Sequence, residues 1–361
     1  MDTKELLERF SRVASPSGYE YMAEPDLRKI IEDGFGGVFD EVRFDKFGSC
    51  RLIKRAAPEI ENPRKIMLDA HLDQIGLVVT EILEGGFLRV KPLGGIDGNI
   101  LSASEFYVYT YEEAEPFIFV NSPERKIMAV AASVPPHLKK TSGNNLPPIE
   151  DIYLDAGFNS KEELEKIVRV GSPVTFKSEF LELENGLVSC AGMDDRLCAA
   201  IIMTAIQSLQ CAPAVEVHAV LSVSEETHQI GASTAAFDIR PEFAVILDVD
   251  FSRDPGIDAA ESIETGKGAG ITYSAMTNIK LTKKIIELAK EKNIPTQITA
   301  SPTSTGTNAD IIQITAEGIP CAVVSIPLKN MHTFNEVCSI GDVESIAGLI
   351  REIIENAEGL M

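Results

Sequence analysis

The sequence is 361 residues long and contains no tryptophan, only five histidines and no pair of cysteines in C-x-x-C spacing. A chain without tryptophan has no indole ring to stack on sugars, which weighs against a glycoside hydrolase. The six cysteines are scattered along the chain. We expect them to be reduced and mostly buried, as in a cytoplasmic protein.

Positive charge is also scarce. The chain has 33 lysines and arginines against 55 aspartates and glutamates, a formal net charge of -22. Such a chain repels nucleic acid and anionic membrane surfaces, so neither is an expected partner. No stretch approaches the roughly 20 apolar residues that span a bilayer, and the N-terminus lacks the apolar segment of a signal peptide. These absences indicate a cytoplasmic protein.

The spacing of apolar residues predicts a two-domain α/β protein. The chain exceeds the size at which single cores stop growing. Strands and helices alternate over residues 1–74 and 179–361, which predicts a doubly wound, mostly parallel sheet with helices on both faces. Its predicted helices are 3–14, 22–34, 195–209, 279–293, 309–317 and 342–357, and its predicted strands are 40–44, 50–54, 65–71, 215–224, 243–249, 296–300 and 320–325.

Residues 75–178 interrupt this alternation with short β-runs separated by glycine, proline and asparagine turns. This rhythm predicts an inserted small antiparallel β-barrel or sandwich. One helix is expected within it, because Ser160 and Glu163 have the spacing of a capping box. The predicted strands of the insert are 76–82, 87–91, 105–110, 117–120 and 126–132.

Acidic and histidine residues gather where several predicted strands of the sheet end. Because the carboxyl ends of parallel strands lie on one edge, these side chains should face a single cleft. Two histidines with three carboxylates suit a pair of divalent cations about 3.5–4 Å apart, with one carboxylate bridging them. The histidines and acidic residues at these strand ends, from which such a site could be assembled, are His71, Asp73, Asp194, Asp195, Glu225, Glu226, Asp248, Asp250 and His332.

Plain structural explanations compete with this interpretation. Asp195 taken alone is better explained as a helix N-cap, Asp250 could begin a turn, and the glutamate pair could be a solvated acidic turn. His218 lies among apolar residues and is expected to be a structural histidine of the sheet. His228 could line the cleft or lie in a loop. The Gly-Lys-Gly-Ala-Gly run at 266–270 lacks P-loop spacing and predicts a flexible turn.

In their order along the chain, these motifs resemble the M42 family of metallo-aminopeptidases, the tetrahedral or glutamyl type, some of which carry an older endoglucanase label. The resemblance covers nearly the whole chain. It is carried by His71-Leu72-Asp73-Gln74-Ile75-Gly76, Met193-Asp194-Asp195-Arg196, Glu225-Glu226 with Gly231-Ala232, Leu247-Asp248-Val249, Ile326-Pro327 through Met331-His332, Ser17-Gly18-Tyr19-Glu20, Pro135-Pro136-His137-Leu138 and Gly306-Thr307-Asn308-Ala309.

The resemblance implies a role for each residue. Asp194 would bridge two metal ions, zinc or cobalt; His71 and Asp248 would complete one site, and Glu226 and His332 the other. Glu225 would be the general base, and Asp73 the partner that supports His71. The insert would be the dimerisation domain of a homo-oligomer, often a dodecamer built from dimers.

Three places depart from the usual pattern of the family. Thr227-His228 stands where Val-Gly is usual after the double glutamate, and Asn308 stands where aspartate is usual. Lys329-Asn330 replaces an Arg-Tyr pair, and lysine cannot reproduce the planar fork of arginine. All five expected ligands are present, so the departures bear on specificity more than on the metal site.

The expected chemistry is hydrolysis of a peptide's N-terminal residue, with Glu225 taking a proton from water and returning it to the leaving amine. A metal-independent endo-β-glucanase is one alternative; it would use two carboxylates about 5–9.5 Å apart and give His71 and His332 no role. A non-catalytic peptide-binding or scaffold relative is the other.

Overall fold

The structure is a computed structural model that describes residues 1–112, 118–132, 149 and 152–361. The segment Pro135-Pro136-His137-Leu138 lies outside these residues. Of the strand predicted at 117–120, the described residues 118–120 are not a strand.

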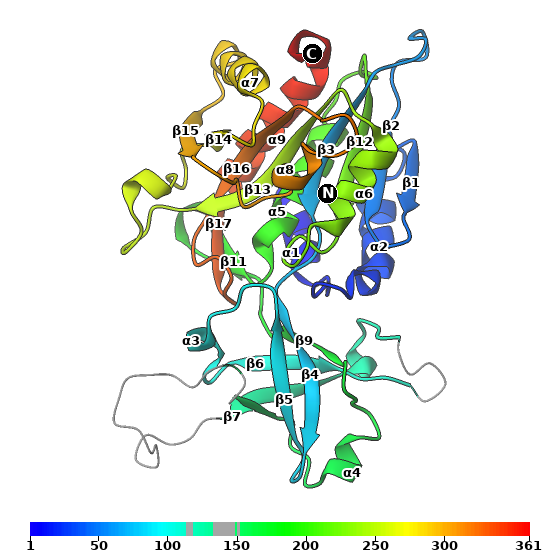
Figure 1. The fold of residues 1–361 in the computed structure, drawn as a ribbon, viewed down its shortest axis with the longest axis vertical. Coiled ribbons are helices and arrows are strands. Elements are labelled where there is room, and N and C mark those ends of the chain that lie inside the picture. Colours follow the sequence, from blue (N-terminus) through cyan, green and yellow to red (C-terminus); the bar gives the residue numbers. More distant parts are fainter. Residues whose placement is uncertain (113–117, 133–148, 150–151) are drawn as a thin grey trace.

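An eight-stranded sheet forms the larger body of the molecule, drawn in the upper part of Figure 1. The strand order is β1-β2-β12-β3-β13-β16-β14-β15. The four adjacent strands β12, β3, β13 and β16 run parallel to one another. Strands β2 and β14 are antiparallel to this central group. The strands are β1 Glu41–Phe44, β2 Cys50–Lys54, β3 Lys65–His71, β12 Glu216–Ser222, β13 Phe243–Phe251, β14 Ala269–Ser274, β15 Thr296–Ser301 and β16 Cys321–Leu328.

Helices cover both faces of this sheet, so the predicted doubly wound α/β fold is confirmed. The side chains of β3 alternate between the two faces. Ile66 and Leu68 join the core beneath the larger helical layer, and Met67 joins the core on the opposite face. The larger layer contains α1 Thr3–Ser11, α2 Glu24–Phe35, α5 Met193–Gln207, α7 Ile279–Glu291, α9 Ile340–Glu355 and α10 Ala357–Leu360, and the smaller contains α6 Ile230–Ile239 and α8 Ala309–Ile312.

The insert is a closed six-stranded barrel in the order β4-β5-β8-β7-β6-β9, drawn below the sheet in Figure 1. It has its own apolar core, which includes Leu77, Val90, Phe106 and Val174. The sequence left a barrel and a sandwich open, and the structure has the barrel. Its elements are β4 Gly76–Leu83, β5 Phe87–Leu93, α3 Gly98–Leu101, β6 Glu105–Tyr109, β7 Lys126–Ala132, β8 Tyr153–Asp155, α4 Lys161–Leu164 and β9 Pro173–Phe176.

Ser160 caps α4, as its spacing predicts, by accepting a hydrogen bond from the N–H of Glu163 at 3.2 Å. A small three-stranded sheet was not predicted; it contains β10 Leu181–Glu182, β11 Leu187–Cys190 and β17 Glu336–Ser339. Short 3₁₀ turns at Glu20–Ala23, Pro123–Arg125, Glu184–Gly186 and Ala259–Glu261 complete the described secondary structure. Within the part of the chain that the structure describes, no helix is long and apolar enough to cross a membrane.

Candidate metal centre

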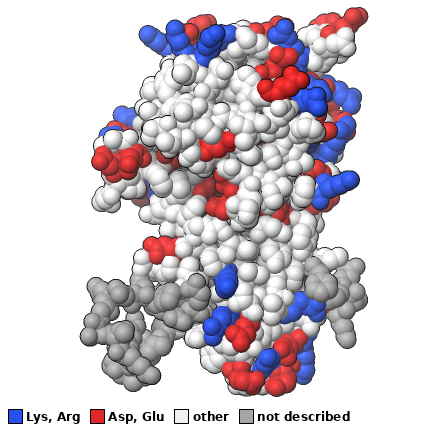
Figure 2. Space-filling view, in the orientation of Figure 1, with Lys and Arg blue, Asp and Glu red and all other residues white. Residues whose placement is uncertain are grey.

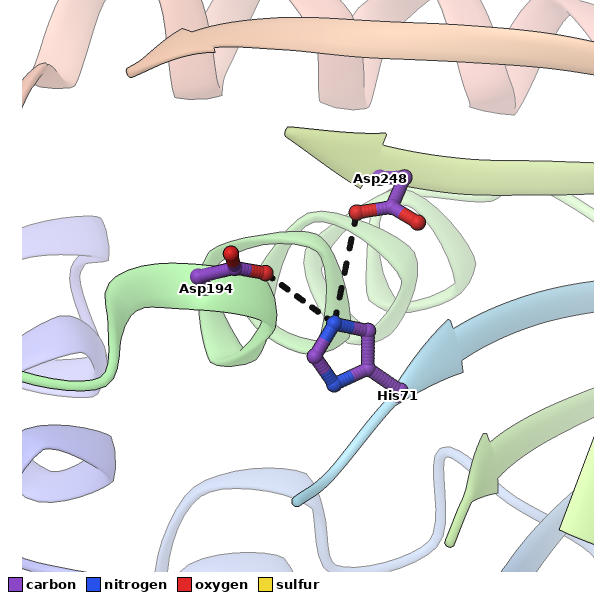
Figure 3. A group of neighbouring side chains, drawn as sticks. All are labelled: His71, Asp194 and Asp248. Atoms are coloured by element: carbon purple, nitrogen blue, oxygen red, sulfur yellow. Dashed lines mark hydrogen bonds and ion pairs between the residues drawn. The ribbon is translucent and has the colours of Figure 1, made fainter. Parts of the chain in front are cut away.

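Two groups of side chains meet at the carboxyl edge of the central strands, where the sheet body adjoins the barrel. The first group contains His71, Asp194 and Asp248, contributed by β3, α5 and β13 (Figure 3). The second contains Asp194, Glu226 and His332. The structure therefore brings together all five residues that the family resemblance implies as metal ligands, and Asp194 belongs to both groups.

Asp194 presents one carboxylate oxygen to each group. Its Oδ1 lies 3.0 Å from Nε2 of His71, which is 4.0 Å from Oδ1 of Asp248. Its Oδ2 lies 3.2 Å from Nε2 of His332, which is 3.3 Å from Oε1 of Glu226. The two groups are thus separated by the width of one carboxylate, the arrangement that a bridging ligand requires.

The hydrogen bonds of the two histidines fix which nitrogen faces the carboxylates. Nδ1 of His71 lies 3.0 Å from the backbone oxygen of Asp73, and Nδ1 of His332 lies 2.8 Å from that of Gly95. A carbonyl oxygen only accepts, so each Nδ1 carries a hydrogen and each Nε2 turns toward a carboxylate oxygen. Such a contact needs a cation, either a proton or a metal ion. Without a metal ion the proton is held tightly: burial alone lowers the pKa of His332, but Asp194 and Glu226 raise it to about 11.

The donor atoms have the spacing and chemistry of a divalent metal site. Tetrahedral bonds of about 2.0–2.2 Å to nitrogen and oxygen place donor atoms about 3.3–3.6 Å apart, within the 3.0–4.0 Å range seen here. Oε1 of Glu226 is buried, and its one polar contact among the described residues is the 3.3 Å ion pair with Nε2 of His332, which falls outside hydrogen-bond geometry. A buried carboxylate oxygen without a donor is costly unless a cation satisfies it. The residues present therefore fit a metal ion in each group.

The buried carboxylates of Asp73 and Asp195 hold the backbone of residues at the site by accepting hydrogen bonds from it. The side chain of Asp73 accepts hydrogen bonds from the backbone N–H of Glu225 at 2.9 Å and of Glu226 at 3.2 Å. Oδ2 of Asp195 accepts one from the N–H of His71 at 3.2 Å. The N-cap prediction for Asp195 is wrong, because Oδ2 of its side chain accepts from His71 and Oδ1 has no hydrogen-bond partner among the described residues, so neither oxygen caps α5. Asp195 instead turns inward toward β3.

Glu336 is a further supporting residue, which sequence reasoning missed. Its Oε2 accepts hydrogen bonds from the N–H of Met193 at 2.7 Å and of Asp194 at 3.3 Å, and its Oε1 accepts one from the N–H of His332 at 3.0 Å. The side chain is buried, which raises the pKa of this carboxyl to about 8. The sequence offers only a weak signal for this role: Glu336 is an acidic residue four positions after His332, at the start of the apolar pair Val337-Cys338.

Glu225 stands beside both groups without belonging to either. Its Oε1 lies 3.3 Å from Nε2 of Gln229, which also donates to the backbone oxygen of Thr307 at 2.9 Å. Burial raises the pKa of Glu225 to about 7. The solvated-turn interpretation of the glutamate pair is wrong, because the Glu226 side chain is only 5% exposed. Ser224, just before the pair, has a left-handed φ of 60°, a conformation that is uncommon for non-glycine residues.

Comparison with known proteins assigns the family. A family model described as M42 glutamyl aminopeptidase matches residues 51–349. The chain belongs to the M42 family. A lysyl aminopeptidase of Pyrococcus furiosus is 33% identical over 97% of this chain and 96% of the relative. The resemblance seen in the sequence is thereby confirmed, and with it the prediction of a peptidase.

Solved structures agree with the M42 assignment. A TET aminopeptidase from a marine sediment Thaumarchaeota archaeon superposes with a TM-score of 0.88, at 28% identity and with 99% of each chain covered. A Pyrococcus horikoshii TET1 peptidase superposes with a TM-score of 0.82, at 26% identity, covering 98% of this chain and 99% of the other. That peptidase can assemble into a tetrahedron or a large octahedral shell.

Three of the side chains that depart from the usual M42 pattern have partners in this chain. Asn308 donates through Nδ2 to Oδ2 of Asp69 at 2.8 Å and to Oγ of Ser222 at 2.9 Å. The hydroxyl of Thr227 lies 3.0 Å from that of Ser17, and Lys329 forms a 2.7 Å ion pair with Asp254. Asn308, Thr227 and Lys329 are therefore each engaged by residues distant in the chain.

The remaining predictions had mixed outcomes. His218 is a sheet histidine whose Nε2 lies 2.8 Å from Oε1 of Glu216, as expected, and His228 is exposed in its loop. Asp250 begins no turn, because β13 continues through it to Phe251. The glycine run at 266–270 does turn, with Gly266 and Gly268 at positive φ, but Ala269 and Gly270 already belong to β14.

Proposed function

We propose that this M42 peptidase is an aminopeptidase that depends on two divalent metal ions. The observation that carries the proposal is the position of Asp194, whose two carboxylate oxygens face the two ligand groups separately. His71 and Asp248 would complete the first metal site, and Glu226 and His332 the second. Nitrogen and carboxylate ligands without sulfur suit zinc or cobalt.

Glu225 would be the general base. When bound, the two ions supply Lewis-acid polarisation of the peptide carbonyl and lower the pKa of water. The carboxylate of Glu225 accepts the proton of the attacking water and returns it to the leaving amine. Its place next to Glu226, yet outside both ligand groups, leaves it free for this transfer.

Asp73 would position both halves of the site. Its backbone oxygen orients His71 through Nδ1, and its carboxylate holds the backbone of Glu225 and Glu226. The carboxylates beyond those needed for metal would bind the free α-amino group that an aminopeptidase must recognise. Asp73 therefore acts through its neighbours, without touching substrate.

Hydrolysis of aminoacyl-p-nitroanilides tests this proposal. The purified chain should release nitroaniline, lose this activity on chelation and regain it with zinc or cobalt. Full activity after verified metal removal would contradict the proposal. Release of reducing sugar from a β-glucan in chelator would favour the glycosidase alternative, and two bound ions with no turnover on a broad peptide panel would favour the non-catalytic one.

For the assembly, we propose that residues 75–178 form a dimerisation domain inserted into a catalytic domain of residues 1–74 and 179–361. The separate apolar core of the barrel supports this division, and the dodecamer and shell assemblies of a TET1 peptidase support association of such dimers into larger oligomers, a dodecamer among them. Light scattering after size exclusion, on the full chain, measures the oligomer directly. A cytoplasmic location is proposed from the six free cysteines.

A further inference from the structure

A cavity of about 390 Å³ opens beside the candidate metal centre. One wall comes from β13, where Val249 and Asp250 directly follow the candidate ligand Asp248. Ser325 of the neighbouring strand β16 also lines it and pairs in register with Asp248. Alternate residues of a strand point to the same side, so Asp250 stands about 7 Å beyond Asp248 along one side of β13.

The opposite wall reaches the proposed general base. Thr307 lines the cavity, and its backbone oxygen accepts the hydrogen bond from Gln229 that also approaches Glu225. The cavity therefore lies between the strand that carries Asp248 and the loop of Thr307, which is linked to Glu225 through Gln229. A peptide whose first peptide bond lies between Asp248 and Glu225 has its N-terminal side chain beside this cavity.

The described charged residues that line the cavity are all acidic. Asp250 and Glu261 line it, and none of its described lining residues is a lysine or arginine. The side chain of Asp250 accepts a hydrogen bond from the N–H of Phe251 at 2.8 Å, and no described lysine or arginine lies within 4.0 Å of it.

Nearby cations are already engaged elsewhere. Arg253 forms a 2.6 Å ion pair with Glu264, and Lys329 forms one with Asp254 at 2.7 Å. On the face drawn in Figure 2, a patch of acidic side chains lies near the middle of the molecule, while most lysines and arginines lie toward the top, the right edge and the barrel. The cavity thus has a carboxylate that is available to a positive charge from outside the chain.

From this arrangement we infer that the cavity receives the side chain of the substrate's N-terminal residue and selects a lysine or arginine there, with Asp250 as the charge partner. The inference rests on the proposed function, because it names the substrate of the same site. Val323, on the same face of the sheet as Asp250, gives the cavity apolar wall for the aliphatic stem of such a side chain. An acidic N-terminal side chain would instead approach two like charges, which opposes its binding.

The test compares kcat/KM of the metal-loaded full chain on lysyl-, arginyl-, leucyl- and glutamyl-p-nitroanilide. We expect the lysyl and arginyl substrates to exceed the glutamyl one by at least about tenfold. Asp250→Asn should lower the lysyl-to-leucyl ratio about tenfold, and Asp250→Glu should retain most of it. Glu242→Gln removes one negative charge at the exposed opposite end of β13 and should leave the ratio within about twofold. The preference should weaken as salt rises, because salt screens the pair.

The outcomes separate this inference from the proposed function. A wild-type chain that cleaves glutamyl as well as lysyl substrate overturns the inference while leaving the aminopeptidase intact. An unchanged lysyl-to-leucyl ratio in folded, metal-loaded Asp250→Asn does the same. A chain that cleaves none of the four substrates overturns the proposed function itself. If the Asp250→Asn variant fails to fold, the substrate ranking of the wild type and its salt dependence still test the preference for lysine or arginine.

Discussion

Glu336 accepts a hydrogen bond from the backbone N–H of His332 at 3.0 Å. His332 has a left-handed φ of 60°, so its position in the loop after β16 needs support from its surroundings. The other oxygen of Glu336 holds the backbone of Asp194, so one buried side chain ties the bridging residue to the last histidine. Support of this kind keeps ligands in place before a metal ion arrives.

Glu336→Gln should weaken metal binding, because its amide N–H₂ would face a backbone N–H where a carboxylate oxygen now accepts. We expect metal affinity to fall about 10- to 100-fold, the usual cost of losing a residue that supports metal ligands. Competition with a fluorescent chelator measures this affinity. Glu355→Gln, an exposed change of the same kind on α9, is the control. Equal affinity in both variants would show that Glu336 does not position the ligands.

Asn308→Asp, the residue usual in the family, should destabilise this chain. It places a second carboxylate 2.8 Å from the buried Oδ2 of Asp69, in place of a donor. We expect a loss of about 2–4 kcal/mol in the free energy of unfolding at pH 8, as for other buried polar groups left without a partner. Urea denaturation measures it. Adding Asp69→Asn should restore much of the loss, and a stable single variant would contradict this explanation of Asn308.

Glu20→Gln should flatten the pH dependence of stability. Burial, and then the charge of Asp73, raise the pKa of Glu20 to about 7 from an ordinary value of 4.5. The folded chain therefore binds this proton more tightly than the unfolded chain, and its contribution is present in full below pH 4.5 and lost as pH rises toward 7. The change amounts to about 2–3 kcal/mol. Urea denaturation at pH 5 and pH 7.5 measures this change. An equal change in stability between the two pH values for the variant and the wild type would contradict the raised pKa of Glu20.

Metal removal should lower thermal stability. Without cations, the carboxylates of Asp194, Glu226 and Asp248 crowd one buried edge, and only protonated histidines offset them. A bound ion stabilises the folded state according to its affinity and concentration, by about 4 kcal/mol at a thousandfold excess over Kd. Calorimetry with and without chelator should show a clear fall in Tm. Asp194→Asn, which changes the bridging residue, should show a smaller fall on chelation; an equal fall would argue against bridging.

The sequence predicted the central strands well because each is a nearly continuous apolar run, as buried parallel strands are. It missed α6 Ile230–Ile239, whose small and apolar residues surround the helix without an amphipathic period. Gly231 in that helix is tightly enclosed: a Cβ there would lie 2.5 Å from the backbone nitrogen of Val223. It also missed β14, which follows a glycine-rich run, and it extended α8 beyond its observed end at Ile312.

The candidate site shows the same division between local and distant information. The strand ends bearing His71 and Asp248 follow from local pattern and sheet topology. Asp195 was assigned to an N-cap by a local rule, whereas its partner, the N–H of His71, lies 124 positions away in the chain. Glu336 likewise reaches Asp194 across 142 positions. Pairings of this kind depend on tertiary packing, which local sequence patterns do not reveal.

Glu225→Gln gives the most direct test of a two-metal aminopeptidase with Glu225 as its general base, because it separates metal binding from proton transfer. The metal content of the purified variant and its turnover of an aminoacyl-p-nitroanilide are measured together with those of wild type. We expect two divalent ions per chain in both proteins and a loss of about 10²–10⁴-fold in kcat for the variant, the usual contribution of a general base. A variant that keeps both ions and wild-type turnover, or a wild-type chain active without metal, would contradict this mechanism.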